Sequence, residues 1–276
     1  MKRKRLLQYI LVNDVCWLFI RPFVYLSTRL QLSRENFLLR KQEDANESLC
    51  GRLFETKTVL NGLFKGMKMG NIKATGSSIY AKLLGSYELE IVPELARLLS
   101  QRYDLLINVG SDEGYYAVGI ARMQPRVKVY AFDCNKRARS ACEALALLND
   151  VGERVITKGC FNKAELPGVA AGEKALFIFD CEGCESEIIT EQIPGSFASA
   201  DFIIELHFEK YHLVAEKLSV LFSHTHNLKL VDALSDHERV MRYDFPEISG
   251  LDYQQKNFIL NEREGYMQWL IATPKS

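Results

Sequence analysis

Two features of the sequence have the residue types and spacing of a nucleoside-binding site. In residues 105–116, an apolar stretch runs into a turn that contains Gly110 and Gly114. Asp133 follows the next apolar stretch, residues 127–132. In doubly wound α/β folds, glycines let the first strand turn into a helix, and an acid at the tip of the second strand binds a ribose. These residues therefore predict a nucleoside-binding α/β domain.

The turn also indicates which nucleoside is bound. Asp112 and Glu113 lie between the glycines, whose spacing is Gly-x-x-x-Gly and not Gly-x-Gly-x-x-Gly. A dinucleotide places its pyrophosphate on the backbone N–H groups of such a turn, where two carboxylates would repel it. S-adenosylmethionine (SAM) has no phosphate and carries a sulfonium and an ammonium group. We therefore expect SAM as the cofactor.

A second set of polar residues follows two later apolar stretches. Asp180 and Glu182 follow one of them, and Glu205 and His207 end the other. Ligands of open α/β sheets bind at the carboxyl ends of the strands, so we expect these side chains near the transferred methyl group. His207 is the candidate general base because the ordinary pKa of histidine lies near operating pH. One alternative is a core histidine bonded to backbone. The other is a divalent metal ion bound by Asp180, Glu182 and Glu205, and we do not favour this metal site.

Four segments occur in the order Ile-Asn-Val-Gly-Ser-Asp-Glu-Gly-Tyr-Tyr, Tyr-Ala-Phe-Asp, Phe-Asp-Cys-Glu-Gly-Cys-Glu-Ser-Glu-Ile-Ile and Glu-Leu-His. Together with residues 62–67 and 82–88, they resemble the FkbM-type group of class I SAM-dependent methyltransferases. The resemblance covers residues 58–274 and implies a Rossmann-like seven-stranded sheet, SAM as donor and often a hydroxyl acceptor on a sugar, polyketide or surface glycan. Asn108 stands where this group usually has an acid that organises the methionine end of the cofactor. We expect Asp112 or Glu113 to supply that charge.

The leading hypothesis is a SAM-dependent O-methyltransferase that acts on a hydroxyl of a sugar, surface glycan or secondary metabolite. The alternatives are a nicotinamide-dependent oxidoreductase, which the acidic turn disfavours, and a non-catalytic scaffold with a SAM fold. The expected catalytic residues are His207, Asp180 and Glu205. The expected cofactor-binding residues are Asn108, Gly110, Ser111, Asp112, Gly114, Tyr115, Asp133, Cys134, Asp180 and Glu182.

Apolar and amphipathic stretches alternate after residue 100. Strands are expected at 105–109, 127–132, 154–157, 175–180, 201–207, 228–234 and 267–273, and helices at 115–123, 135–148, 185–192 and 210–223. This alternation predicts an α/β fold: a Rossmann-like, seven-stranded, mostly parallel sheet with helices on both faces and an antiparallel end. The expected divisions are an N-terminal helical segment (1–45), a lid or substrate-side segment (46–100) and the SAM-binding domain (101–276).

The N-terminal segment starts with four basic residues at 2–5, and an apolar stretch follows at 6–26. Asn13, Asp14, Arg21 and Pro22 interrupt that stretch. A charge at the centre of a spanning helix costs about 2.5–3.5 kcal/mol, so a membrane span is not expected. Two interpretations remain. One is a helix that packs on the protein or on a second subunit in a homodimer, and the other is a helix lying on an anionic membrane surface.

Composition restricts the partners and the compartment. Among 276 residues, 35 Lys and Arg balance 35 Asp and Glu, so no overall field attracts a polyanion, and nucleic acid is not expected as a partner. The seven cysteines are an odd number scattered through expected core elements, which favours reduced thiols in a cytoplasmic protein. Cys181 and Cys184 form a single Cys-x-x-Cys motif, and we expect them to be small core residues.

Overall fold

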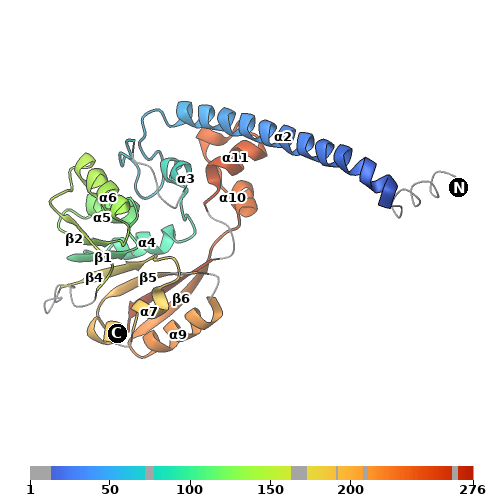
Figure 1. Cartoon of the computed structure of the whole chain (residues 1–276). Helices are drawn as coiled ribbons and strands as arrows, with labels where there is room; N and C mark the ends of the chain where they lie inside the picture. The colour runs from blue at the N-terminus through green and yellow to red at the C-terminus, as the bar shows by residue number, and fades with distance from the viewer. Residues whose placement is uncertain are drawn as a thin grey trace. The chain divides into compact units, whose positions relative to one another are not determined.

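The protein is described by a computed structural model that covers residues 14–71, 78–162, 173–190, 192–207, 211–262 and 267–275. The chain divides into two compact units, residues 1–53 and residues 54–276. Each unit is described by itself. The large unit contains all the strands that the structure describes, and Figure 1 shows its elements in colours that follow the chain.

In the described residues of the large unit, seven strands form one sheet in the order β3-β2-β1-β4-β5-β7-β6. Strands β1 to β5 are parallel, and β7 is antiparallel to both β5 and β6. The predicted seven-stranded, mostly parallel sheet with an antiparallel end is therefore confirmed. The strands are β1 (Leu105–Val109), β2 (Lys128–Phe132), β3 (Val155–Lys158), β4 (Ala175–Phe179), β5 (Asp201–Leu206), β6 (His226–Asp232) and β7 (Gln268–Pro274).

Helices cover both faces of the sheet (Figure 1). Helices α5 (Tyr115–Met123) and α6 (Lys136–Leu148) pack on β1, β2 and β3 from one side, and α7 (Glu185–Ile188) and α9 (Tyr211–Ser223) pack on β5 from the other. Every residue of β1, β4 and β5 is consequently buried. This double burial explains why these strands are almost continuously apolar in sequence, since neither face meets water.

The helix expected at 185–192 is interrupted, and this prediction was wrong. Helix α7 ends at Ile188, and a second helix, α8 (Gln192–Ser196), begins four residues later. Pro194 lies in the first turn of α8, where its missing N–H needs no partner. In one helix continuous from 185 to 196, its ring would clash with the carbonyl of Thr190, so α7 and α8 cannot merge into one helix.

The segment between β6 and β7 is helical, although we expected no helix after residue 223. It contains α10 (Asp236–Arg242), a 3₁₀ turn (Pro246–Ile248) and α11 (Tyr253–Leu260). Both α-helices start with a capping box, formed by Ser235 with Glu238 and by Asp252 with Gln255. These pairs can be recognised in the sequence, and we missed them. Helix α11 packs on α3 (Ile79–Leu84), and the short helix α4 (Val92–Leu99) leads into β1.

The N-terminal unit contains one long helix, α2 (Asp14–Leu53). It runs through the boundary that we placed after residue 45, because residues 40–48 are polar but include no glycine or proline, and most of them are good helix formers. No helix in the described part of the chain is long and apolar enough to span a membrane. The basic residues 2–5 lie outside the described residues, so membrane-surface contact and a homodimer both stay predictions.

Deletion of residues 1–30 is expected to leave the sheet domain folded. Phe19 and Phe23 of α2 are 71% and 74% exposed, so their removal takes little apolar area out of the folded protein. The expected loss is below about 1 kcal/mol, which corresponds to about 2–4 °C in melting temperature for a domain of this size. Circular dichroism during heating, with the full chain as control, measures it. An unfolded truncated chain would assign these residues to the core.

Candidate functional site

A cavity of about 840 Å³ lies at the carboxyl edge of the sheet. Its volume falls within the range of about 300–1,000 Å³ typical of small-molecule sites. Its lining includes most of the residues that the sequence singled out. These are Gly110, Ser111, Asp112, Tyr115, Asp133, Cys134, Asp180, Glu182, Glu205 and His207. Two expected cofactor residues, Asn108 and Gly114, do not line this cavity.

Both glycines of the turn are required by close packing. A Cβ atom on Gly110, which has a φ of +76°, would lie 1.4 Å from the carbonyl oxygen of Asp180. A Cβ atom on Gly114, with a φ of +95°, would lie 2.6 Å from Sγ of Cys142 on α6. Only glycine can adopt a positive φ so easily and also fit so close to these neighbouring atoms. Gly110 thus brings the tips of β1 and β4 together, and Gly114 brings the start of α5 onto α6.

Asp133 braces the turn from the tip of β2. Its Oδ2 accepts a hydrogen bond of 2.9 Å from the backbone N–H of Asp112, and its Oδ1 accepts one of 2.7 Å from Asn135. Asp112 has a φ of +42°, a conformation that this bond holds in place. Asn135, and not Asp133, caps α6 through Arg137. Each carboxylate oxygen of Asp133 retains a lone pair on the cavity side of the chain for a further donor.

The structure distinguishes the two acids of the turn. Glu113 is fully buried and pairs with Lys82, and burial raises the pKa of its carboxyl while Lys82 lowers it. Asp112 lines the cavity, so it is the acid of the pair that faces a ligand. Asn108 is 1% exposed, and its Oδ1 is buried without a hydrogen-bond partner in the described structure.

Several cavity residues lie outside the two sets of polar residues that the sequence singled out, in the expected lid segment and after α11. Lys82 lies 4.7 Å from the ring centroid of Tyr87, and both line the cavity. Glu262 also lines it and accepts a 3.1 Å hydrogen bond from the backbone N–H of Glu88. Burial raises the pKa of Glu262 well above its usual range, although the charge of Arg239 opposes this shift. Glu262 follows α11 with no local motif, so only the fold could reveal it.

His207 is surrounded by four carboxylates. Its Nδ1 lies 3.0 Å from Oε1 of Glu185, and its Nε2 lies 3.4 Å from Glu182, 3.7 Å from Asp180 and 3.8 Å from Glu205. Burial lowers the pKa of His207, but hydrogen bonds with Glu182 and Glu185 and the nearby negative charges raise it to about 10. Without another cation, His207 is therefore protonated at neutral pH. This raised pKa disfavours His207 as a general base at neutral pH, and its carboxylate neighbours differ from the backbone partners of a core histidine.

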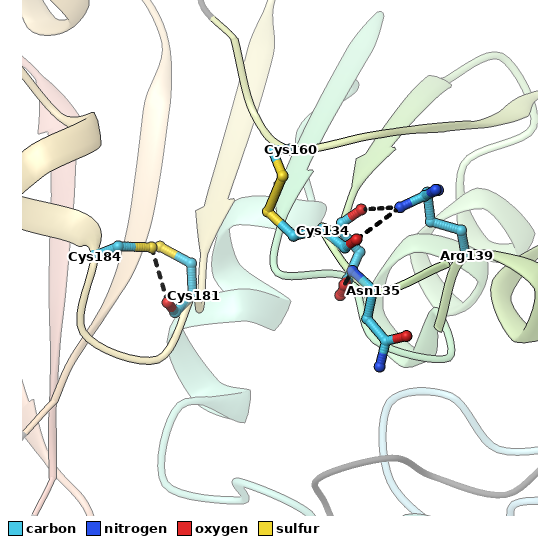
Figure 2. Close-up of a disulfide and its surroundings, with 7 residues drawn as sticks. Cys134, Asn135, Arg139, Cys160, Cys181 and Cys184 are labelled. Carbon is cyan, nitrogen blue, oxygen red and sulfur yellow. Dashed lines mark hydrogen bonds between the residues drawn. A yellow bond between two sulfur atoms is a disulfide. The ribbon is translucent and has the colours of Figure 1, made fainter. Parts of the chain in front are cut away.

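Cys134 and Cys160 differ from our expectation of reduced thiols, whereas Cys50 and Cys142 are buried free thiols. Cys134 and Cys160 form a disulfide at the carboxyl ends of the neighbouring strands β2 and β3 (Figure 2). Cys134 thus lines the cavity as a disulfide. Cys181 and Cys184 are free thiols that also line the cavity, and Sγ of Cys184 donates to the carbonyl of Cys181 at 2.9 Å. The sequence could not reveal this pairing because 26 positions separate Cys134 from Cys160.

A scan against protein-family models found no match, and a search of the curated proteins found none. Similar solved structures include an O-methyltransferase from Bacillus cereus in complex with SAH, at 8% identity and a TM-score of 0.44, covering 67% of this chain and 80% of that chain. Precorrin-6y C5,15-methyltransferase from Geobacter metallireducens has 11% identity and a TM-score of 0.43, covering 67% and 89%. A SAM-dependent O-methyltransferase from Thermotoga maritima has 10% identity and a TM-score of 0.43, covering 67% and 64%. Likenesses of this size are too weak to assign a cofactor or a reaction to this chain.

When EDTA keeps metal ions away from His207, its pKa predicts that the stability of the protein depends on pH. In the folded protein, the pKa of His207 is about 10 and exceeds the ordinary value of 6.5. The protonated imidazole therefore stabilises the fold fully below pH 6.5, and this stabilisation is lost as the pH rises through 10. The free energy of unfolding should therefore fall more between pH 7 and 10 in the wild type than in His207→Gln. Urea denaturation at a series of pH values measures this difference. Parallel pH profiles for the two proteins would contradict it.

Proposed function

We propose that this chain is a SAM-dependent O-methyltransferase of the FkbM type, acting on a hydroxyl of a sugar, surface glycan or secondary metabolite. The main support is the position of Asp133. Its carboxylate braces the glycine turn at one part of the cavity, and the Asp180, Glu205 and His207 cluster lines another part. A ribose-binding acid and a set of acid–base groups thus share one small-molecule site, which is what methyl transfer from a nucleoside cofactor requires.

The lining of the cavity fits SAM better than a dinucleotide. Asp133 would hold the ribose hydroxyls, and Phe161 would provide an apolar wall for the adenine near the Cys134 disulfide. Asp112 would face the positive methionine end. Lys82 of the lining is already paired with Glu113, so it offers little to a pyrophosphate. The excess of carboxylates therefore favours a sulfonium and an ammonium over two phosphates.

When bound, SAM supplies an electrophilic methyl group. The residues of this chain must then orient the acceptor hydroxyl in line with that group and take up its proton. Asp180 and Glu205 are the carboxylates of the cluster that lie on neighbouring strand ends, β4 and β5. Nε2 of His207 lies 3.7 Å from Asp180 and 3.8 Å from Glu205. We assign orientation and proton uptake to this group, with Tyr87 and Glu262 on the acceptor side.

Asp133→Asn is expected to weaken SAM binding by about 1.5–3 kcal/mol, or about 10- to 150-fold, because the ribose loses charge-assisted hydrogen bonds. Asparagine has nearly the same shape and keeps one oxygen for the N–H of Asp112, so the turn should stay folded. Calorimetric titration measures the affinity. Glu143→Gln, an exposed carboxylate on α6 outside the cavity, is the matched control. Equal affinities in both variants would remove Asp133 from the cofactor site.

The function itself is tested by comparing cofactors and then looking for product. SAM at 100 times its dissociation constant should stabilise the protein by about 2.7 kcal/mol, whereas NAD should leave the melting temperature unchanged. Radiolabelled SAM, incubated with sugars, glycans and hydroxylated metabolites, should then yield a labelled ether and S-adenosylhomocysteine. Stabilisation by NAD and not by SAM would favour the oxidoreductase. SAM binding with no labelled product from any acceptor would favour the scaffold.

A further inference from the structure

We propose that Asp180, Glu205 and His207 bind one divalent transition-metal ion at the wall of the cavity. The sequence alone led us to consider only the carboxylates and to disfavour a metal. The fold adds an imidazole to them: one potential ligand atom from each of the three residues lies within 4.8 Å of the other two. The three residues lie at the ends of the adjacent strands β4 and β5, so a rigid sheet sets their positions.

The distances around Nε2 of His207 suit a shared metal ion better than a shared proton. Nε2 lies 3.7 Å from Asp180 and 3.8 Å from Glu205. N–H···O hydrogen bonds span about 2.7–3.2 Å, so Nε2 is too far from both of these oxygens for a hydrogen bond, and its nearest carboxylate is Glu182 at 3.4 Å. Two ligands that each lie about 2.1 Å from one ion in a tetrahedral arrangement are about 3.4 Å apart. The observed separations need only a slightly wider angle at the ion.

The other nitrogen of His207, Nδ1, lies beside a buried carboxylate. Nδ1 lies 3.0 Å from Oε1 of Glu185, and the same oxygen accepts a 3.0 Å hydrogen bond from the backbone N–H of Cys181. Glu185 is fully buried, and its Oε2 has no hydrogen-bond partner in the described structure. Metal-binding histidines almost always donate their second N–H to a carboxylate or carbonyl, which turns the other nitrogen toward the metal. Oε1 of Glu185 lies at the right distance from Nδ1 for this role, although the N–H and the oxygen are not aligned as a hydrogen bond in the described structure.

The charge of the cluster also favours a cation. Asp180, Glu182, Glu185 and Glu205 contribute four negative charges within 4 Å of one imidazole. Even a protonated imidazole leaves these five groups with an excess of three negative charges. Glu205 is only 3% exposed, so water screens its carboxylate poorly. A divalent ion would neutralise more of this charge than a proton does.

The ligand types identify the class of ion. One imidazole nitrogen with two carboxylate oxygens suits a first-row divalent ion such as Mn²⁺, Fe²⁺ or Zn²⁺, whereas Mg²⁺ and Ca²⁺ prefer oxygen ligands alone. The remaining coordination positions would open into the cavity, where water or an acceptor hydroxyl could bind. A role of this ion in activating that hydroxyl rests on the proposed function, but binding of the ion does not.

The test titrates Mn²⁺ into the EDTA-treated and dialysed full chain and follows free Mn²⁺ by electron paramagnetic resonance. We expect one saturable site per chain, and affinity at least tenfold weaker in Asp180→Asn and in His207→Ala. Glu185→Gln should weaken it about 10- to 100-fold by loosening the imidazole. Glu187→Gln, an exposed carboxylate on the same short helix as Glu185, should leave the affinity within threefold.

Two further readouts keep the outcomes distinct. Circular dichroism of each variant shows whether it is folded, and the Co²⁺ absorption spectrum of the wild type reports nitrogen and oxygen ligands directly if His207→Ala unfolds. No saturable Mn²⁺ site, or equal affinity in wild type and Asp180→Asn, overturns the inference. SAM binding is measured on the same samples. If SAM binds but no metal site is found, the metal inference fails and the proposed function stands. If a metal site is found but SAM does not bind, only the proposed function is contradicted.

Discussion

The close approach of Gly110 to the carbonyl oxygen of Asp180 is the contact on which the rest of the site depends. Strands β1 and β4 are neighbours, and the absence of a Cβ atom on Gly110 lets their carboxyl ends touch. This contact places the turn that Asp133 braces beside the acidic cluster that follows β4 and β5. Any other residue at position 110 would push the two halves of the site apart, because the obstacle is backbone and not a flexible side chain.

The negative charges are compensated to different degrees in the glycine turn and in the acidic cluster around His207. Glu113, inside the turn, is buried and paired with Lys82, so that ion pair contributes to the fold of the turn. His207, in contrast, faces four carboxylates and compensates only part of their charge. The acidity of this cavity is the common reason for proposing a positively charged cofactor at one part of it and a divalent ion at another.

The sequence predicted most of the sheet because its central strands β1, β4 and β5 are buried on both faces. Strand β1 occupies residues 105–109 as expected, and the remaining strands differ from their expected bounds by at most two residues. The prediction failed where the local pattern was ambiguous or ignored. The expected helix at 185–192 ends at Ile188, and two capping boxes begin helices in a segment where we expected none. In that segment, capping chemistry predicts the structure better than apolar periodicity does.

By itself, the sequence determined the doubly wound α/β sheet, the glycine turn, the acid at position 133 and the convergence of Asp180, Glu205 and His207 at one edge. These features follow from local patterns, since the ends of parallel strands always meet at the same edge of the sheet. Only the tertiary structure decided the raised pKa of His207, the Cys134 disulfide and the place of Glu262 in the cavity. Each of these depends on groups brought together from distant positions, and a pKa is set by the distances and burial of its neighbours, which no local pattern encodes.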